Sequence, residues 1–414
     1  MSQAGRTLTA LVAGLLLGIL GARFAAGWAE AAVGIAAPVG TLWLNALQMT
    51  IVPLVVALLI TGIAASAEAA RAGRLATRAL VLFVVLLWCS ALVAAFLTPL
   101  LLDLFPLPLD AARSLREALA TSEPVGQVAG FADFVSGIVP TNPVTAAASG
   151  AILPLTVFTI VFAFAVVQLP EAHRSRIVDF FRAIEAAMLV VIRWVLWIGP
   201  VGVLALAYVV GVRAGSAAFG ALLHYVLIVT AVGAVVWLAA WPLALLGGRV
   251  PLGRFTRAIL PAQVVALSTQ SSLASLPAML KGTERLGISD DTSGIVLPMA
   301  VAVFRATGPV MNLAVAIYIA YWFGIELTPA RLAAGVAAGA VTTMGAAGIP
   351  GQASFVTSIA PICLAMGVPI EPLGLLIAVE TLPDLMRTLG NVSMDVAVTA
   401  TAARGAEGPP GEAP

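Results

Sequence analysis

The chain has 414 residues, of which 61% are hydrophobic and only 10% are charged, and its formal net charge is +1. A soluble domain carries about 25% charged residues, so this composition excludes a protein that faces water on all sides. The near-neutral charge also offers no basic footprint for nucleic acid. We therefore predict a polytopic helical protein whose partner is the lipid bilayer and which binds no nucleic acid.

Apolar segments close to the ~20 residues that cross a bilayer as a helix recur along the chain. Six come first, near residues 8–28, 40–64, 79–102, 144–169, 186–211 and 218–246. The later ones are interrupted by Ser, Gly and Pro, at 258–281, 292–323, 334–365 and 370–402. The charged, Pro/Gly-rich end of the chain, 404–414, is typical of a disordered tail.

Arginine placement predicts the orientation. Arginines cluster in the loops after the second, fourth and sixth segments, beginning at Arg71, Arg174 and Arg249, whereas the loop 103–140 is acidic. Basic loops stay in the cytoplasm. We therefore predict a multi-pass protein of the cell membrane with cytoplasmic N- and C-termini.

Two short polar tips interrupt the later segments: STQSSLASLPAM at 268–279 and GAAGIPGQASF at 345–355. Either tip alone is compatible with an ordinary surface turn. Paired interruptions at corresponding positions indicate a transporter site instead. Non-helical backbone at membrane depth survives only inside protein or beside a cavity.

The last apolar segment carries a polar stripe. Spacings of four, three, four and four residues put its members within about 80° of one helix face; they are Glu380, Asp384, Arg387, Asn391 and Asp395, with Thr388 at the edge. A charge at the bilayer centre costs about 2.5–3.5 kcal/mol on insertion scales. A structural salt bridge between Asp384 and Arg387 is one interpretation. A cavity that binds a zwitterionic ligand accounts for the whole stripe.

The order D-x-x-R-T-x-x-N-x-x-x-D in this stripe resembles the last helix of the dicarboxylate/amino acid:cation symporter family, the glutamate transporter homologues. Other segments resemble its second, fourth and fifth helices and its two re-entrant hairpins, at 44–66, 140–166, 198–207, 271–277 and 346–351. The resemblance implies an all-α polytopic membrane fold of eight transmembrane helices plus two re-entrant helical hairpins.

The family's organisation implies a homotrimer in which each protomer has a fixed scaffold and a transport domain that moves as an elevator. Residues 1–250 would form six N-terminal helices, mostly scaffold and trimer contacts, with the third and sixth in the transport domain. Residues 251–403 would form the transport core, with both hairpins and helices seven and eight.

The resemblance also implies roles in binding a small anionic substrate. Arg387 would pair with the substrate's side-chain carboxylate and Asp384 with its α-ammonium, while Thr388 and Asn391 would add hydrogen bonds. The hairpin tips would clamp the substrate through Ser271, Ser272, Gly348, Ile349 and Pro350. Relatives that carry C4-dicarboxylates lack the first aspartate, so Asp384 favours aspartate or glutamate.

The chain departs from the family at the seventh helix, where the signature Asn-Met-Asp-Gly-Thr contains sodium ligands. Here the sequence reads Phe304, Arg305, Ala306, Thr307, Gly308, so the asparagine and the aspartate are gone. The family's ligands on the third helix fall near Leu86, Cys89 and Ser90. Gly308 and the following proline could still break the helix.

Three interpretations of Arg305 stay open: it replaces sodium and pairs with Asp395, it lies in the substrate pocket beside Arg387, or it reaches the interface from a helix end. The coupling ion could be a proton, through Glu380 or Asp384, or sodium, or neither. A residual sodium site could use backbone carbonyls at Ala302, Thr343, Met344 and Ala346. No cofactor is expected.

The main prediction is a secondary transporter of acidic amino acids or related dicarboxylates with reduced or absent sodium coupling. Alternatives are a sodium-coupled symporter that uses residual sites, a non-transporting receptor, and an anion channel. An intramembrane enzyme is disfavoured, since Asp384 and Asp395 share one helix and His224 fits a core position better than a catalytic one.

Overall fold

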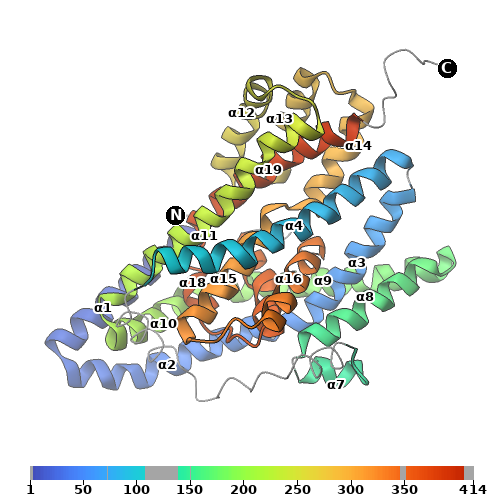
Figure 1. The fold of residues 1–414 in the computed structure, drawn as a ribbon. Helices are drawn as coiled ribbons and strands as arrows, with labels where there is room; N and C mark the ends of the chain where they lie inside the picture. Colours follow the sequence, from blue (N-terminus) through green and yellow to red (C-terminus); the bar gives the residue numbers. More distant parts are fainter. Residues whose placement is uncertain (1–2, 72, 108–138, 150, 346–350, 405–414) are drawn as a thin grey trace, which may run out of the picture.

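The computed structural model describes residues 3–71, 73–107, 139–149, 151–345 and 351–404, and every element in this part of the chain is helical (Figure 1). Five of its helices are long and apolar enough to cross a membrane, or six if the bent pair α9 and α10 forms one span. Large exposed apolar side chains such as Phe24, Trp28, Phe96 and Trp194 cover the outside. An outer surface of this kind suits contact with lipid tails.

The first part of the chain forms nine helices in the described residues. They are α1 (Gln3–Phe24), α2 (Ala26–Gln48), α3 (Ile51–Arg71), α4 (Arg74–Leu104), α7 (Pro143–Ala148), α8 (Ile152–Gln168), α9 (Glu171–Trp197), α10 (Gly199–Ala214) and α11 (Ala217–Pro242). The segment predicted near 186–211 is not one straight helix, because α9 and α10 meet at an angle of 55°. Pro200, in the first turn of α10, has no N–H to continue the α9 ladder.

The second part is more interrupted, as the sequence indicates. It contains η1 (Leu243–Gly247), α12 (Leu252–Thr269), α13 (Ser272–Leu286), α14 (Asp290–Met299), η2 (Ala300–Phe304), α15 (Thr307–Phe323), α16 (Pro329–Gly345), α17 (Gly351–Ala365), α18 (Leu373–Leu376) and α19 (Thr381–Ala403). The predicted segment 292–323 breaks at Arg305, between η2 and α15, and not at Gly308–Pro309. Pro309 lies in the first turn of α15, where its missing N–H breaks no helical bond.

Two helix pairs form hairpins. In the first, α12 packs against α13, and the chain reverses at Gln270, which adopts the left-handed conformation with a φ of 52°. Ser271 caps α13, since its hydroxyl oxygen accepts a hydrogen bond from the Ala274 N–H at 3.2 Å. In the second hairpin α16 packs against α17. The tip of this hairpin, 346–350, lies outside the described residues.

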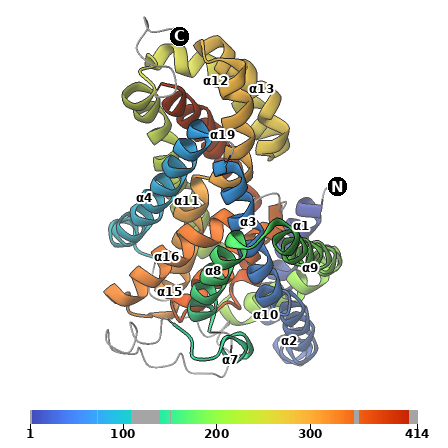
Figure 2. The same cartoon turned by 90° about the vertical axis from the view of Figure 1, so that its right-hand side faces the viewer.

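The helices form two groups. In the first, α10 packs against α1 and α2, and α3 packs against α8 and α9. In the second, α4 and α11 pack against α15 and α19, and α12 and α13 pack beside α19 (Figure 2). Contacts of α3 with α16 and α17, and of α10 with α18, join the groups. The predicted third and sixth spans, α4 and α11, thus pack with the C-terminal helices.

The centre of the second group is buried all round. Every residue of α15 from Thr307 to Ala320 is buried, although this stretch contains the polar Asn312. A helix without a polar face is typical of a core or a membrane interior. The C-terminal half of α19 is buried as completely. Any polar group on these two helices must therefore find its partners inside the protein.

Candidate functional site

The polar stripe of α19 lies inside the protein. Glu380, Asp384, Arg387, Asn391 and Asp395 are all buried, and Asp395 is 1% exposed. Four ion pairs occur in the described residues, and both of the buried ones belong to Arg387. A buried guanidinium needs such partners because an isolated charge costs several kcal/mol in a medium of low dielectric.

Arg387 binds two carboxylates through one nitrogen. Its Nη1 donates to Glu380 Oε1 in a close ion pair and to Asp384 Oδ1 at 3.1 Å. Its Nη2 donates to Asn312 Oδ1 at 3.4 Å. The Tyr225 hydroxyl, from α11, donates to the other Glu380 oxygen at 3.4 Å. The salt bridge predicted between Asp384 and Arg387 therefore exists, but it is part of a larger network.

One donor of this network has no partner. The buried Arg387 Nε makes no hydrogen bond within the described part of the chain. Buried polar groups are normally paired, so each exception needs an explanation. Arg387 lines a small pocket, and a carboxylate that entered it could use the Nε edge of the guanidinium. Arginine matches carboxylates in this bidentate manner.

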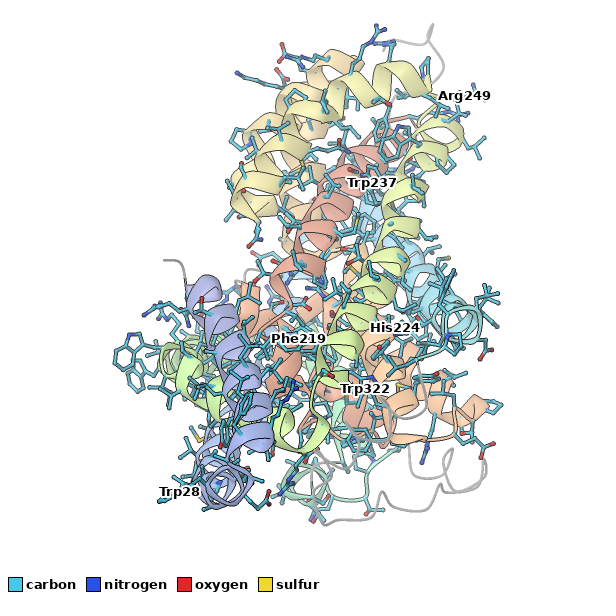
Figure 3. The ribbon with its side chains drawn as sticks, turned by 90° about the vertical axis from the view of Figure 1, so that its left-hand side faces the viewer. Trp28, Phe219, His224, Trp237, Arg249 and Trp322 are labelled. Carbon is cyan, nitrogen blue, oxygen red and sulfur yellow. The ribbon has the colours of Figure 1, made fainter. Side chains whose placement is uncertain are left out.

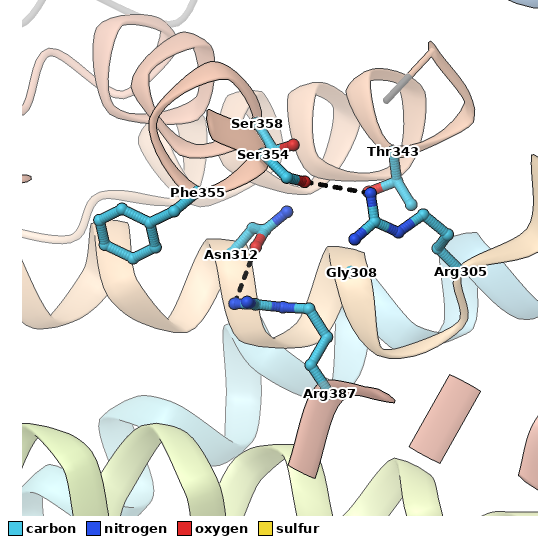
Figure 4. Close-up of a pocket in the computed structure, with 8 residues that line it drawn as sticks. All are labelled: Arg305, Gly308, Asn312, Thr343, Ser354, Phe355, Ser358 and Arg387. Atoms are coloured by element: carbon cyan, nitrogen blue, oxygen red, sulfur yellow. Dashed lines mark hydrogen bonds between the residues drawn. The ribbon is translucent and has the colours of Figure 1, made fainter. Parts of the chain in front are cut away.

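The pocket lies between the break in the seventh helix, the second hairpin and α19 (Figure 4). Its lining residues are mostly polar: Arg305, Gly308, Asn312, Thr343, Ser354, Phe355, Ser358 and Arg387. Arg305 Nη1 donates to Ser354 Oγ, on α17, at 3.0 Å. Two guanidinium groups, from different elements, thus point into the same space.

The break itself is held together by polar contacts. Asn391 Oδ1 accepts the Thr307 N–H, at the start of α15, at 2.9 Å. Ser90 of α4 donates its hydroxyl to the Ala306 carbonyl at 2.7 Å. A broken helix leaves such backbone groups without intrahelical partners, and side chains must replace them. Ser90, predicted near the lost sodium ligands, and Asn391 both serve this purpose.

Phe304, which the resemblance aligns with the family's asparagine, is a buried residue of η2. Its ring stacks on Phe83 of α4, with centroids 4.8 Å apart and planes 21° from parallel, and both rings are fully buried. Sodium requires oxygen ligands. Two stacked phenyl rings provide none, so these residues do not fit a sodium ion of the family's kind.

Asp395 does not form the expected ion pair with Arg305 in the described part of the chain. Both of its carboxylate oxygens are buried and make no hydrogen bond there. Arg305 is bound instead to Ser354 on the second hairpin. Asp395 therefore does not join the hydrogen-bond network of Arg387 in the described part of the chain.

The other predicted residues lie in several places. Ser271 and Ser272 are at the tip of the first hairpin and do not line the pocket. At the tip, Ser271 caps the N-terminus of α13. The Thr388 hydroxyl donates to the Asp384 carbonyl at 2.9 Å, within its own helix. Ala302 is exposed on η2. The Met344 side chain and all of Ala346, Gly348, Ile349 and Pro350 lie outside the described residues.

Sequence reasoning missed Asn312, Ser354 and Ser358. A signal existed for Asn312, because it is a lone amide in the apolar run that follows Pro309. Polar residues inside membrane spans usually face the protein interior and carry function. The two serines lie one helical turn apart on α17, but neither stands out within an ordinary Ser/Thr-containing segment.

His224 is half-buried, and hydrogen bonds hold its ring in place. It lies on α11 between Phe219 and Trp237 (Figure 3). Its two ring nitrogens lie 2.6 Å from the Tyr318 hydroxyl and 2.7 Å from the Phe105 carbonyl. Both are thus engaged by hydrogen bonds, as expected for a structural histidine.

Interrupted helices that meet buried charges inside a polytopic helical protein define the class of secondary transporters. The chain matches the sodium:dicarboxylate symporter family over residues 4–404 and belongs to that family. The prediction from the polar stripe is therefore confirmed at the level of the family. Its members are transporters and not enzymes, and the chain is a multi-pass membrane protein.

Named relatives span most of the chain. The proton/glutamate-aspartate symporter of Escherichia coli is 28% identical over 402 residues, which cover 94% of this chain and 90% of the relative. The neutral amino acid transporter B(0) of Oryctolagus cuniculus is 31% identical, with 94% and 77% covered. The C4-dicarboxylate transport protein of Anaeromyxobacter sp. (strain K) is 28% identical, with 86% and 80% covered.

Proposed function

We propose that this protein transports small acidic solutes, namely acidic amino acids or C4-dicarboxylates, across the cell membrane. The observation that carries the proposal is the buried Arg387 guanidinium, which lines a pocket and whose Nε has no hydrogen-bond partner among the described residues. Relatives named for glutamate, aspartate and C4-dicarboxylates support this substrate class. We propose cytoplasmic termini on the basis of the arginine-rich loops.

In the proposed binding mode, a substrate carboxylate approaches the Nε edge of Arg387. Asp384 would take an α-ammonium group through the carboxylate oxygen that does not bind Arg387. Thr388 and Asn391 would act indirectly, because their side chains hold backbone groups of α19 and α15. Ser271 and Ser272, with 346–351, would close over the substrate from the two hairpin tips.

We further propose the elevator mechanism, with eight transmembrane helices, two re-entrant hairpins and a homotrimer. Support comes from the two helix groups, since α4 and α11 pack mainly against α15 and α19, whereas α11 makes only minor contacts with α10. In Figures 1 and 2, α12, α13 and the end of α19 extend beyond the N-terminal end of α1. Such an offset suits a transport domain that slides past a scaffold.

The proposed coupling differs from that of a sodium symporter. The stacked Phe83 and Phe304 rings remove oxygen ligands, which supports reduced or absent sodium dependence. Glu380 and Asp384 share one guanidinium, and a proton on either carboxylate would weaken its hold on Arg387. A proton-driven carrier or an exchanger is therefore the favoured form.

A sodium-coupled symporter is the second candidate, and Asp395 favours it. Neither oxygen of this buried carboxylate has a hydrogen-bond partner in the described part of the chain, and a cation would satisfy both. Carbonyl groups near Ala302, Thr343, Met344 and Ala346 could complete such a site. A non-transporting receptor has no comparable observation in its favour.

Uptake of radiolabelled L-aspartate and succinate into proteoliposomes tests the proposal. Each solute is offered with no gradient, a sodium gradient or a proton gradient, with and without the same solute inside. Proton-driven accumulation or pure exchange supports the favoured form, and sodium-driven accumulation supports the second candidate. Arg387→Ala is the matched control variant under each condition. No uptake of either solute by the wild type under any condition refutes the transport proposal.

A further inference from the structure

The pocket at the broken helix is unusual in its charge. Two of its lining residues, Arg305 and Arg387, are cationic, and no acidic side chain lines it in the described part of the chain. The two guanidinium groups reach the pocket from different elements, Arg305 from the helix break and Arg387 from α19 (Figure 4). Glu380 and Asp384, which pair with Arg387, are not among the residues that line the pocket.

Two like charges in one buried pocket repel each other. The guanidinium groups of Arg305 and Arg387 carry the same charge and line the same pocket. Inside a protein the effective dielectric is far below that of water, so this repulsion is stronger than at a surface. An anion placed between both guanidinium groups is attracted by each, and it also removes their mutual repulsion.

The contacts of the two arginines differ in a way that suits two carboxylates. Arg387 is held by Glu380, Asp384 and Asn312. Arg305 donates to the Ser354 hydroxyl, a neutral group on the second hairpin. A hydroxyl such as Ser354 or Ser358 can turn to donate to a carboxylate bound at Arg305. Each end of an extended dicarboxylic acid would then meet its own guanidinium.

We propose that Arg305 binds the side-chain carboxylate of an amino acid substrate, or the second carboxylate of a simple dicarboxylic acid, while Arg387 binds the other carboxylate. Arg305 would thereby restrict transport to dicarboxylic acids. This inference rests on the proposed function and adds its specificity. The group bound at Arg305 also contacts α17, so occupancy by a dicarboxylate would tie the second hairpin to the helix break. A monocarboxylate of the same length leaves one guanidinium without an anion.

The protein should discriminate strongly between dicarboxylates and monocarboxylates, because the group that a monocarboxylate would leave without an anion is the charged Arg305 guanidinium. Charge-assisted hydrogen bonds contribute more than neutral ones. A site that is built for a polar group rejects a substrate that lacks it far better than an apolar pocket rejects a missing methylene. We expect L-asparagine, which replaces one carboxylate of L-aspartate by an amide of similar shape, to bind at least about 100-fold more weakly than L-aspartate.

Competition binding on the purified full-length protein in nanodiscs tests this inference. The probes are L-aspartate, succinate and L-asparagine, measured on wild type, Arg305→Met, Arg305→Lys and the control Arg331→Met. Arg331 lies on α16 and donates to the Glu326 carbonyl in its own connecting loop at 3.0 Å, away from the pocket. Thermal unfolding of each variant shows whether it is folded.

Arg305→Met should weaken L-aspartate and succinate about 10- to 100-fold and leave L-asparagine nearly unchanged. Arg305→Lys should retain a preference for the dicarboxylic acids, and Arg331→Met should behave as wild type. If Arg305→Met does not fold, the wild-type preference together with its retention in Arg305→Lys decides the question. Wild type that binds L-asparagine as tightly as L-aspartate overturns the inference.

Other outcomes separate the inference from the function on which it rests. If Arg305→Met weakens the binding of all three probes equally, Arg305 is structural and the inference is wrong. If the selectivity is unchanged and binding becomes dependent on sodium, Arg305 replaces a cation and the inference is also wrong. Wild type that binds both L-aspartate and L-asparagine still satisfies the transport proposal. Wild type that binds none of the three refutes the proposed function itself.

Discussion

Asn391 on the last helix binds Thr307, the first residue after the break in the seventh helix. Asn391 Oδ1 accepts the Thr307 N–H at 2.9 Å, and the Thr307 hydroxyl lies 2.7 Å from the same oxygen and 2.8 Å from the Arg387 carbonyl. One amide thus fixes the start of α15 against the helix that carries Arg387. The position of the guanidinium depends on this contact.

Asn391→Ala should therefore destabilise the protein. The substitution leaves the buried Thr307 N–H without an acceptor, which costs about 1–3 kcal/mol. Asn391→Asp is the matched control, because it keeps an acceptor oxygen at the same place. The midpoint of thermal unfolding should fall clearly in the alanine variant and less in the aspartate variant. Equal midpoints for wild type and Asn391→Ala would contradict the capping role.

Glu380→Gln should flatten the pH dependence of uptake. Glu380 holds Arg387 as a carboxylate, and protonation removes that attraction. A substrate carboxylate then competes more easily for the guanidinium, so wild-type uptake should rise as pH falls. The glutamine variant has no group to titrate at this position and should lose most of the rise. Initial uptake rates of wild type and Glu380→Gln, measured between about pH 5.5 and 8, check this prediction.

Exchange provides the control for the same variant. If Glu380→Gln still exchanges internal for external L-aspartate, its pocket is intact and the loss concerns coupling alone. A variant with an unchanged pH profile would show that Glu380 is not the group that titrates.

The polar stripe of α19 could be predicted because its spacing follows one regular helix. Periodicity of this kind needs no knowledge of the rest of the fold. Glu380 fitted the same face, although its role as the closest partner of Arg387 did not follow from spacing, since it precedes the first residue of α19. The hairpins were equally accessible, because glycine, serine and proline interrupt their apolar runs.

The surroundings of Arg305 could not be predicted in the same way. Its partner Ser354 is 49 residues away in the sequence, on a helix whose approach is set by tertiary packing. The Phe83–Phe304 stack likewise joins two separate spans. The resemblance to the family implied that Phe304 replaces an asparagine, but only the fold shows what fills the space. Packing of this kind depends on shape, which one sequence does not reveal.

Phe304→Ala should be strongly destabilising. The ring is fully buried against Phe83, and deletion of a buried phenyl group costs about 3–5 kcal/mol. Phe96→Ala is the control on α4, since that ring is 76% exposed and supports little of the core. Thermal unfolding in detergent should give a large drop for Phe304→Ala and a small one for Phe96→Ala. Similar drops would show that the stack contributes nothing beyond an ordinary apolar contact.

Gly18→Ala should disrupt the contact between α1 and α10. A Cβ atom at Gly18 would lie 2.4 Å from the Tyr208 carbonyl oxygen and 2.8 Å from the Val212 nitrogen, both rigid backbone atoms. The helices would have to separate, and overpacking of this kind costs about 1–3 kcal/mol. Gly34→Ala on α2 is the matched control, because nothing lies within 4 Å of the added atom. There the better helix propensity of alanine should stabilise by up to about 1 kcal/mol.

The two glycine variants should therefore shift the unfolding midpoint in opposite directions. Suppose that the group formed by α1, α2 and α10 is a fixed scaffold. Gly18→Ala should then lower the unfolding midpoint, but substrate affinity at the distant Arg387 should stay within about twofold of wild type. The reason is that well-separated sites act independently. A large loss of affinity in Gly18→Ala would show that the two helix groups are energetically coupled. A fixed scaffold beside an independently moving transport group would then be the wrong description.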